Sequence, residues 1–364
     1  MKVKFLDLIT QNSIVKDRFL KEVSSIVDSA SFVAGKKTAE FEELFANYCG
    51  VKYAIAVSNG TTALHAALLG LDLKGEVLTA PNSFIATSEA ISHCPKLKHR
   101  FVDADSTGNM NFKKATESMT SDVVAVLPTS LYGNPCDMTN YGLLAKENNL
   151  VFLNDAAQAH GSLYRGFKTA QLAHVTCFSF YPGKNLGTCG EGGAVVTDSE
   201  ELYNRIKCLV NHGQKAKYQH EIVGYNYRIG EIQAAMLSIK LEYIEEWNDK
   251  RIEVAKRYRN NLSGNSKIKL LEVKEGDKCV YHIFPVFIEN RDSIKESLLK
   301  EGIETGIHYP TPIHLQNAYK HLNHREGDFP ETEAQARTEL SLPMFPELTE
   351  NEIDYVSERL ISLV

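Results

Sequence analysis

Apolar residues recur at helical spacing in some segments of the chain and form short continuous runs in others. In residues 38–48 they return every three or four positions, which predicts a helix that Gly50 ends. Short apolar runs between turn residues predict buried strands at residues 51–57, 76–80, 123–127, 150–154 and 174–180, and we expect a further strand at 98–102. Helical segments separate most of them: one through Leu69, one from Ala86, one near Lys113 and one from Met138. This alternation predicts an α/β fold with a mainly parallel sheet between helices.

The second half of the chain has a different pattern. A helical stretch almost free of Gly and Pro fills residues 229–262, as one bent helix or as two joined helices. We place a domain boundary inside it, near Glu246, which gives a large domain of residues 1–246 and a small C-terminal domain of residues 247–364. Beyond the boundary we expect strands at 268–273 and 279–288, then helices and a short strand near Ile307. This pattern predicts a smaller α+β domain.

Composition excludes several classes of protein. The net charge of −6 and the lack of a basic tract argue against nucleic-acid binding. No apolar run is long enough for a signal peptide or a membrane helix, so we expect no membrane partner and a cytoplasmic location. The seven cysteines are scattered without C-x-x-C spacing, so neither a disulfide framework nor a zinc site is expected.

Two strand ends offer a carboxylate and an amine. Asp155 follows the strand at residues 150–154, and Lys184 lies in a loop after the strand at 174–180. An amine can form a Schiff base with an aldehyde, and a carboxylate can keep a pyridine nitrogen protonated. Pyridoxal 5′-phosphate (PLP) needs both groups. The alternatives are a helix N-cap for Asp155 and a solvated surface residue for Lys184, although five nearby glycines would let the backbone approach a ligand.

Further segments match other parts of this cofactor. Residues 58–62, between a strand and a helix start, could bind a phosphate together with Ser179, or could form an ordinary capped turn. Phe84 could stack on a flat ring or lie in the core. Gln158 and His160 could contact the hydroxyl edge of the ring.

A second candidate site is the segment of residues 308–314. Its two histidines and one tyrosine beside prolines could shape a substrate pocket or be structural. No carboxylate or cysteine completes a ligand set nearby, so no metal is expected.

Seven segments, in order, resemble the DegT-like sugar aminotransferases, which are fold-type I PLP enzymes. They are SNGTTALHAAL (58–68), LYGNPCDM (131–138), NDAAQAHG (154–161), CFSFYPGKNLGTCGEGGAVVTD (177–198), GYNYRIGEIQAAM (224–236), IHYPTPIHLQ (307–316) and LSLPMFP (340–346). The resemblance covers nearly the whole chain. It implies a fold-type I PLP transferase with a mainly parallel, seven-stranded sheet between helices and a smaller α+β C-terminal domain. In one departure, Ser130 stands where the family usually has histidine.

Carried over residue by residue, the resemblance implies one catalytic residue, Lys184, which binds PLP and moves protons. It implies cofactor contacts at Gly60, Thr61, Phe84, Asp155, Gln158, Ser179, Lys184 and Asn226. Asn226 matches an asparagine that reaches the phosphate from the neighbouring subunit, which implies a homodimer with shared active sites. Substrate contacts are expected at Tyr181, Arg228, His308, Tyr309 and His314.

The resemblance also implies a reaction. Residues 181–187 are most similar to enzymes that aminate C3 of dTDP-3-keto-6-deoxyhexoses. The expected function is therefore transfer of the amino group of L-glutamate to this nucleotide-linked keto sugar, which leaves 2-oxoglutarate. The alternatives are a 4-keto sugar nucleotide as acceptor, a PLP-dependent sugar dehydratase, and a non-catalytic sugar-binding regulator. Dehydratases of this family carry histidine in place of the lysine, whereas this chain has Lys184.

Overall fold

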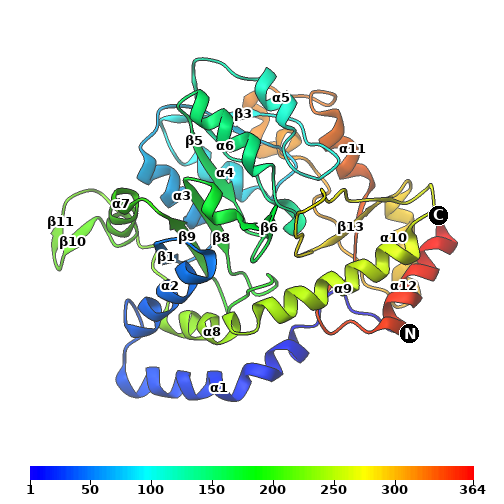
Figure 1. The fold of residues 1–364 in the computed structure, drawn as a ribbon, viewed down its shortest axis with the longest axis horizontal. Coiled ribbons are helices and arrows are strands. Elements are labelled where there is room, and N and C mark those ends of the chain that lie inside the picture. Colours follow the sequence, from blue (N-terminus) through cyan, green and yellow to red (C-terminus); the bar gives the residue numbers. More distant parts are fainter.

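A seven-stranded sheet forms the centre of the larger part of the molecule (Figure 1), in a computed structural model that describes residues 1–364. Its strands lie in the order β1 (Tyr53–Val57), β9 (Gly193–Thr197), β8 (Val175–Ser179), β5 (Val151–Asp155), β4 (Val123–Val126), β2 (Gly75–Thr79) and β3 (Leu97–Phe101). Neighbours from β8 to β3 pair in parallel, while β9 pairs antiparallel with β1 and β8. The predicted α/β class with a mainly parallel sheet is confirmed.

Helices cover both faces of the sheet because the strands bury side chains on both faces. In β1, Ile55 and Val57 join one core, whereas Ala54 and Ala56 join another. The helices of this part are α1 (Leu8–Ser29), α2 (Lys36–Cys49), α3 (Gly60–Leu71), α4 (Ala86–Ser92), α5 (Phe112–Glu117), α6 (Met138–Glu147), α7 (Glu200–Val210) and α8 (Glu231–Leu241). Residues of α3 and α7 lie in the first core and residues of α2 and α8 in the second.

The long helical stretch is two helices. The first, α8, ends at Leu241, and α9 (Ile244–Leu262) continues from Tyr243 into the smaller part of the molecule (Figure 1). Helix α1, which the sequence pattern did not predict, packs along α8. It buries only three residues, Gln11, Val15 and Ile26. No helix combines the length and the apolar character that crossing a lipid bilayer requires.

The smaller part contains a three-stranded antiparallel sheet of β12 (Lys269–Leu270), β13 (Phe284–Phe287) and β14 (Glu339–Leu342). The helices α10 (Arg291–Lys300), α11 (Pro330–Thr338) and α12 (Glu350–Leu363) complete it. The two predicted strands are shorter than expected, and the predicted strand near Ile307 is wrong. Two prolines soon after it lack the N–H groups of a strand ladder, so only Gly306 forms an isolated bridge, with Ser341 of β14.

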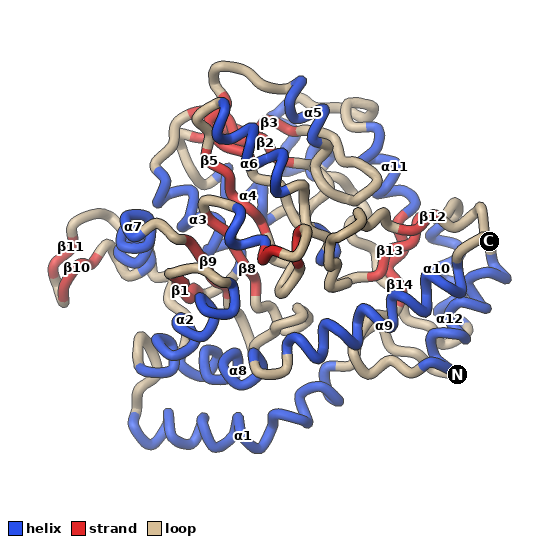
Figure 2. Tube along the Cα trace, viewed as in Figure 1, coloured by secondary structure: helices blue, strands red, loops and turns tan.

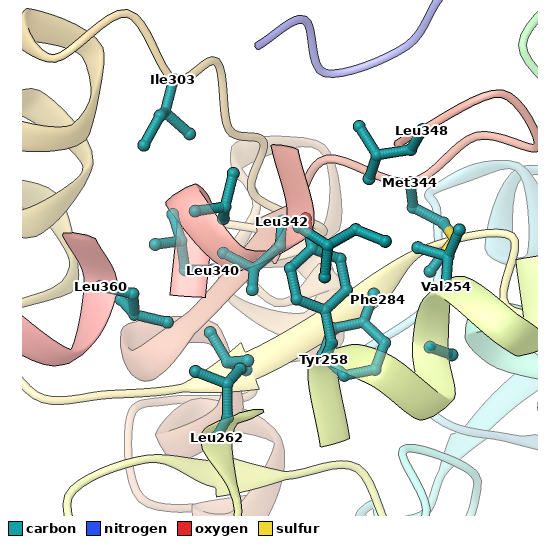
Figure 3. Close-up of a cluster of buried hydrophobic side chains, with 14 of the residues drawn as sticks. Val254, Tyr258, Leu262, Phe284, Ile303, Leu340, Leu342, Met344, Leu348 and Leu360 are labelled. Atoms are coloured by element: carbon teal, nitrogen blue, oxygen red, sulfur yellow. The ribbon is translucent and has the colours of Figure 1, made fainter. Parts of the chain in front are cut away.

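A separate hydrophobic core holds the smaller part together (Figure 3). Its labelled side chains come from α9, β13, β14 and α12 and the loops between them: Val254, Tyr258, Leu262, Phe284, Ile303, Leu340, Leu342, Met344, Leu348 and Leu360. Val3 joins this core, and its N–H donates to the Gly302 carbonyl oxygen at 2.8 Å. The first residues of the chain therefore pack with the smaller part, while the division near Glu246 stays a prediction.

Two small hairpins lie outside the main sheets. They are β6 (Leu163–Tyr164) with β7 (Phe167–Lys168), and β10 (Gln214–Ala216) with β11 (Gln219–His220). The second projects from the larger part, at the left of Figure 2. Its turn residue Tyr218 is 82% exposed. Short 3₁₀ helices occupy Leu131–Gly133, Thr169–Leu172, Ile313–Leu315 and Asn317–Leu322.

Candidate active site

The carboxyl ends of two adjacent parallel strands bring the predicted cofactor residues together. β5 ends at Asp155 and β8 ends at Ser179, and the two strands pair with Asp155 opposite Cys177. The loop after β8 carries Lys184. Ligands of open α/β sheets bind in the crevice at this edge.

Asp155 is a buried carboxylate held by two hydrogen bonds. Thr87 Oγ1 donates to Oδ2 at 2.7 Å, and the Ala157 N–H donates to Oδ1 at 3.1 Å. A turn rather than a helix follows Asp155, so the helix-cap alternative does not hold. Burial raises the pKa of Asp155, although both hydrogen bonds and the Lys184 amine favour the charged form. A cationic ring nitrogen placed beside Asp155 would therefore be stabilised strongly.

Lys184 is partly buried rather than a solvated surface residue. Burial lowers the pKa of its amine to about 8, and Asp155 opposes that shift. A substantial fraction of the amine is therefore neutral near physiological pH, which nucleophilic attack and proton transfer both require.

His282 contacts the Lys184 amine, and the sequence interpretation did not include it. Its Nε2 lies 3.5 Å from Lys184 Nζ, and its Nδ1 lies 3.2 Å from Asn185 Oδ1. Asn185 Nδ2 donates to the Val280 carbonyl oxygen at 3.0 Å, which fixes Oδ1 as the atom facing His282. Nδ1 of His282 therefore donates, and Nε2 presents a lone pair to Lys184. Burial and the nearby Lys184 and Arg251 charges lower the pKa of His282, so its ring is neutral.

The start of α3 forms a polar cradle beside Ser179. Asn59 caps the helix by accepting the Thr62 N–H at 2.8 Å, so residues 58–62 form a capped turn. The cap leaves the N–H groups of Gly60 and Thr61 without a partner in the protein. A Cβ on Gly60 would lie 2.6 Å from the Cβ of Ser179, so the two segments touch. This arrangement suits a phosphate, which helix N-termini attract.

The substitution Gly60→Ala tests this cradle. The new methyl group would collide with Ser179, and relieving such an overlap costs about 1–3 kcal/mol, so we expect roughly tenfold weaker PLP binding. The measurement is a fluorescence titration of the cofactor-free protein with PLP. Gly142→Ala is the matched control, because a Cβ at this helical position meets nothing within 4 Å. Equal PLP affinity of the Gly60→Ala variant and the wild type would contradict the assignment.

Phe84, Gln158 and Tyr309 lie together. Phe84 is 54% exposed, so it is not a core aromatic, and its ring centroid lies 5.5 Å from that of Tyr309. Gln158 Nε2 donates to the Tyr309 hydroxyl at 3.2 Å, and its Oε1 accepts the Tyr132 N–H at 2.6 Å. This contact joins the segment of residues 308–314 to the turn after β5. His160 instead packs in the core against Phe178, and neither of its ring nitrogens has a partner.

Two expected substrate contacts occupy very different environments. Tyr181 is 55% exposed, three residues before Lys184. His314 is fully buried, with Nε2 at 3.1 Å from Glu333 Oε1 and its ring 4.7 Å from that of Phe329. These are the contacts of a structural histidine, and a role of His314 in substrate binding stays a prediction.

Asn226 and Arg228 lie beside the end of β1. The Ser58 N–H donates to the Tyr227 carbonyl oxygen at 2.7 Å, which attaches this segment to the phosphate cradle. The Asn226 side chain is exposed, and Arg228 Nη2 donates to its Oδ1 at 2.8 Å. Neither side chain is hydrogen-bonded to Lys184, Asp155 or Ser179 of the same chain.

Comparison with known proteins decides the family. The model of the DegT/DnrJ/EryC1/StrS aminotransferase family matches residues 13–361. The chain belongs to this family. The predicted class of enzyme, a PLP-dependent sugar aminotransferase, is confirmed, and so is the predicted cofactor.

Relatives of this aminotransferase are similar over almost their whole length. A pleiotropic regulatory protein of Geobacillus stearothermophilus is 36% identical over 99% of the chain and 98% of the relative. The dTDP-3-amino-3,4,6-trideoxy-alpha-D-glucose transaminase of Streptomyces venezuelae is 37% identical over 95% and 92%. The dTDP-3-amino-3,6-dideoxy-alpha-D-galactopyranose transaminase of Aneurinibacillus thermoaerophilus is 37% identical over 98% of each.

Solved structures agree with the fold. The crystal structure of S. venezuelae DesV in complex with a ketimine intermediate has a TM-score of 0.96 at 36% identity, and it covers 100% of this chain and 98% of that chain. The structure of NtdA from Bacillus subtilis with the bound cofactor PMP has a TM-score of 0.92 at 30% identity, with coverage of 100% and 85%. Both similarities extend over the two parts of the molecule.

Proposed function

We propose that this aminotransferase moves the amino group of L-glutamate to a nucleotide-linked keto-6-deoxy sugar, with a dTDP-3-keto-6-deoxyhexose as acceptor, in the cytoplasm. The observation that carries the reaction type is the partly buried Lys184 amine near the carboxylate of Asp155, in a member of this family. The names of the S. venezuelae and A. thermoaerophilus relatives, both dTDP-3-amino sugar transaminases, support the choice of acceptor.

The residues of the site fit the demands of PLP, which supplies an electron sink when bound. Asp155 binds the protonated ring nitrogen, and the N–H groups of Gly60 and Thr61 with Ser179 bind the phosphate. Nζ of Lys184 would hold the cofactor, and as a neutral amine it would move protons at the site. The lowered pKa of Lys184, about 8, supports this role, because an unperturbed lysine would stay almost entirely charged.

Two other functions are weaker candidates. The G. stearothermophilus relative carries the name of a regulatory protein, which favours a non-catalytic regulator. A regulator has no need for Lys184, Asp155 and Ser179 together, and a protein that gains no visible absorbance with PLP would favour it. A dehydratase of this family would carry histidine at position 184, and this chain carries lysine.

The acceptor is tested with two substrates under the same conditions. We expect faster amination of a dTDP-3-keto-6-deoxyhexose than of the corresponding 4-keto compound, measured as 2-oxoglutarate released from L-glutamate. Other relatives are named for UDP-linked sugars, and one, from Campylobacter jejuni, is a 4-amino sugar transaminase. Preference for the 4-keto compound would therefore overturn the C3 assignment and leave the aminotransferase assignment intact.

We also propose that two copies of the chain share their active sites, with Asn226 of one reaching the phosphate bound by the other. Large apolar side chains are exposed on α1 and around the projecting hairpin, including Ile9 at 78%, Tyr218 at 82% and Val223 at 93%. A second copy would remove them from water. Asn226 follows this hairpin closely in sequence, and its side chain is exposed.

Mixed dimers test the shared site. Lys184→Ala and Asn226→Asp should each inactivate the enzyme alone, the second by placing a negative charge at the phosphate. Each mixed dimer would contain one site with both native residues, so the two co-expressed chains should recover about a quarter of wild-type activity. No recovery in purified mixed dimers would show that Asn226 acts within its own chain, and an active Asn226→Asp variant would show that Asn226 has no role at the phosphate.

A further inference from the structure

A chain of hydrogen bonds leads from a buried carboxyl group to the ring of His308. Glu339 and Ser341 lie two residues apart on β14, so their side chains share a face of the sheet, and both are fully buried. The Ser341 hydroxyl is hydrogen-bonded to Glu339 Oε1. Nδ1 of the His308 ring lies 2.8 Å from Ser341 Oγ, and the backbone N–H of His308 donates to Glu339 Oε2 at 2.6 Å.

The His308 ring is held in one orientation. The Tyr132 hydroxyl donates to the His308 carbonyl oxygen at 2.8 Å, and the ring stacks on Phe5 with centroids 5.9 Å apart. Gly306 leaves room for the ring edge, since a Cβ there would lie 2.8 Å from His308 Cε1. Nδ1 therefore faces Ser341, while Nε2 has no partner in the protein. The next residue, Tyr309, contacts Gln158 of the cofactor site.

We propose that Glu339, through Ser341, sets which nitrogen of His308 carries the proton, and so decides whether Nε2 donates or accepts a hydrogen bond at the substrate. A hydroxyl has one proton to donate. When Glu339 is ionised, Ser341 donates to Glu339 and accepts from Nδ1–H, and Nε2 is an acceptor. When Glu339 carries a proton toward Ser341, Ser341 donates to Nδ1 and Nε2–H is a donor.

The two states differ by one proton. A proton that arrives at Nε2 displaces the Nδ1 proton to Ser341 Oγ, and the hydroxyl proton of Ser341 passes to Glu339 Oε1. Only N–H and O–H bonds form and break, and the ring ends neutral. Glu339 thus stores a proton taken up at Nε2, and Ser341 and Glu339 act as positioning residues for His308.

Electrostatics favours the donor state at neutral pH. Burial raises the pKa of Glu339 to about 8. The hydrogen bonds from the Ser341 hydroxyl and the His308 backbone N–H, together with the charge of Arg291, oppose this rise. Burial and the Lys184 charge lower the pKa of His308 to about 4, so the ring itself stays neutral.

The other titratable groups that face this pair are few. Tyr132 and Tyr309 lie near Glu339, both with raised pKa values and therefore neutral. Lys184 and His282 lie on the ring side. Below about pH 8, Nε2–H is therefore offered to an acceptor, and an anionic oxygen is the strongest one available.

This inference rests on the proposed function only for its ligand, which is either the diphosphate of the sugar nucleotide or the carboxylate of glutamate. The KM values of the two substrates, measured separately from pH 6.5 to 9.5, distinguish these sources. We expect the KM of one substrate to rise roughly tenfold as pH passes through about 8, because Nε2 changes from donor to acceptor. No rise in either KM would overturn the assignment of an anionic ligand.

Glu339→Gln separates this effect from the titration of Lys184. The amide N–H of the glutamine can donate to Ser341, and its oxygen can accept the backbone N–H of His308. The variant is therefore locked in the state in which Nε2–H of His308 is a donor. Its KM should stay low at pH 9.5. Ser341→Ala should also abolish the rise, at a higher KM, and Ser341→Thr should restore it. Ser357→Ala, a buried serine on α12 that donates to the Ile353 carbonyl oxygen, is the control and should keep the wild-type profile.

The tautomer itself is measured by NMR of the holoenzyme labelled with ¹⁵N-histidine, with the His308 signals identified by their loss in His308→Asn. We expect the proton on Nε2 at pH 7 and on Nδ1 at pH 9.5 in the wild type, and on Nε2 at both values in Glu339→Gln. A proton on Nδ1 at pH 7, or no change with pH, would overturn the proposal. This result does not depend on turnover, so failure of the proposed function would not be confused with it.

Discussion

Replacing Lys184 with alanine is expected to abolish turnover and the visible absorbance of the bound cofactor. Nζ of Lys184 is the primary amine that lies near Asp155, and the proposed function assigns it both the covalent attachment and the proton transfer. Loss of such a group lowers kcat by roughly 10⁴-fold. Turnover is measured as 2-oxoglutarate released, and absorbance on the same purified sample.

Two control variants test whether the loss of activity is specific to the amine of Lys184. Lys184→Arg keeps the charge but cannot become neutral or form the attachment, so it should be as inactive as alanine. Lys113→Ala removes a lysine whose side chain is 86% exposed and should match the wild type. A small primary amine added to Lys184→Ala should restore part of the proton transfer. Multiple turnovers by Lys184→Ala without added amine would reject the assignment.

Asp155→Asn is expected to have the second-largest effect on turnover, and it should also weaken PLP binding. The amide keeps the shape of the side chain and can still accept from Thr87 Oγ1, but it carries no charge to hold a ring nitrogen protonated. Losing a charge-assisted hydrogen bond of 1.5–3 kcal/mol weakens PLP binding by roughly 10- to 100-fold. Because the neutral ring is the poorer electron sink, kcat should fall by roughly 100-fold or more at saturating PLP.

Thr87 provides the matched comparison for Asp155. Thr87→Ser keeps the hydroxyl that donates to Asp155 Oδ2, and Thr87→Val removes it at nearly the same volume. Only the valine variant should bind PLP more weakly, and less so than Asp155→Asn. The dissociation constants come from fluorescence titration of the cofactor-free proteins. An Asp155→Asn variant within threefold of the wild type in both kcat and PLP affinity would show that Asp155 has no role at the ring.

The fold was predictable where each strand has a local signal. Of the five parallel strands, β2, β4, β5 and β8 follow short apolar runs, whereas β3 contains Lys98, His99 and Arg100 and was expected from its place in the alternation of strands and helices. The sequence contains no signal for the direction of β9, because an apolar run has the same pattern in a parallel strand as in an antiparallel strand. Neither β9 nor β14 was expected, and the strand expected near Ile307 does not form.

The grouping of the expected cofactor residues was predictable because these residues follow strand ends. Asp155, Ser179, Lys184 and Gly60 all lie at or just beyond the carboxyl ends of strands that meet at one edge of the sheet. His282 and Asn185 are 97 residues apart, and Glu339 lies 31 residues from His308. The contact of His282 with Asn185 depends on how the smaller part packs against the larger one. The contact of Glu339 with His308 depends on how β14 packs within the smaller part, and no spacing in the sequence encodes either contact.

The sequence by itself determined the alternation of strands and helices, the placement of an amine and a carboxylate at strand ends, and the resemblance to a family of sugar aminotransferases. These follow from local propensity and from motifs of a few residues. Only the tertiary structure decided the buried environments. It lowered the pKa of Lys184, buried His314 against Glu333, and joined Glu339 to His308. Desolvation and hydrogen bonding act between groups that only the folded chain brings together, so their effects cannot be read from sequence order.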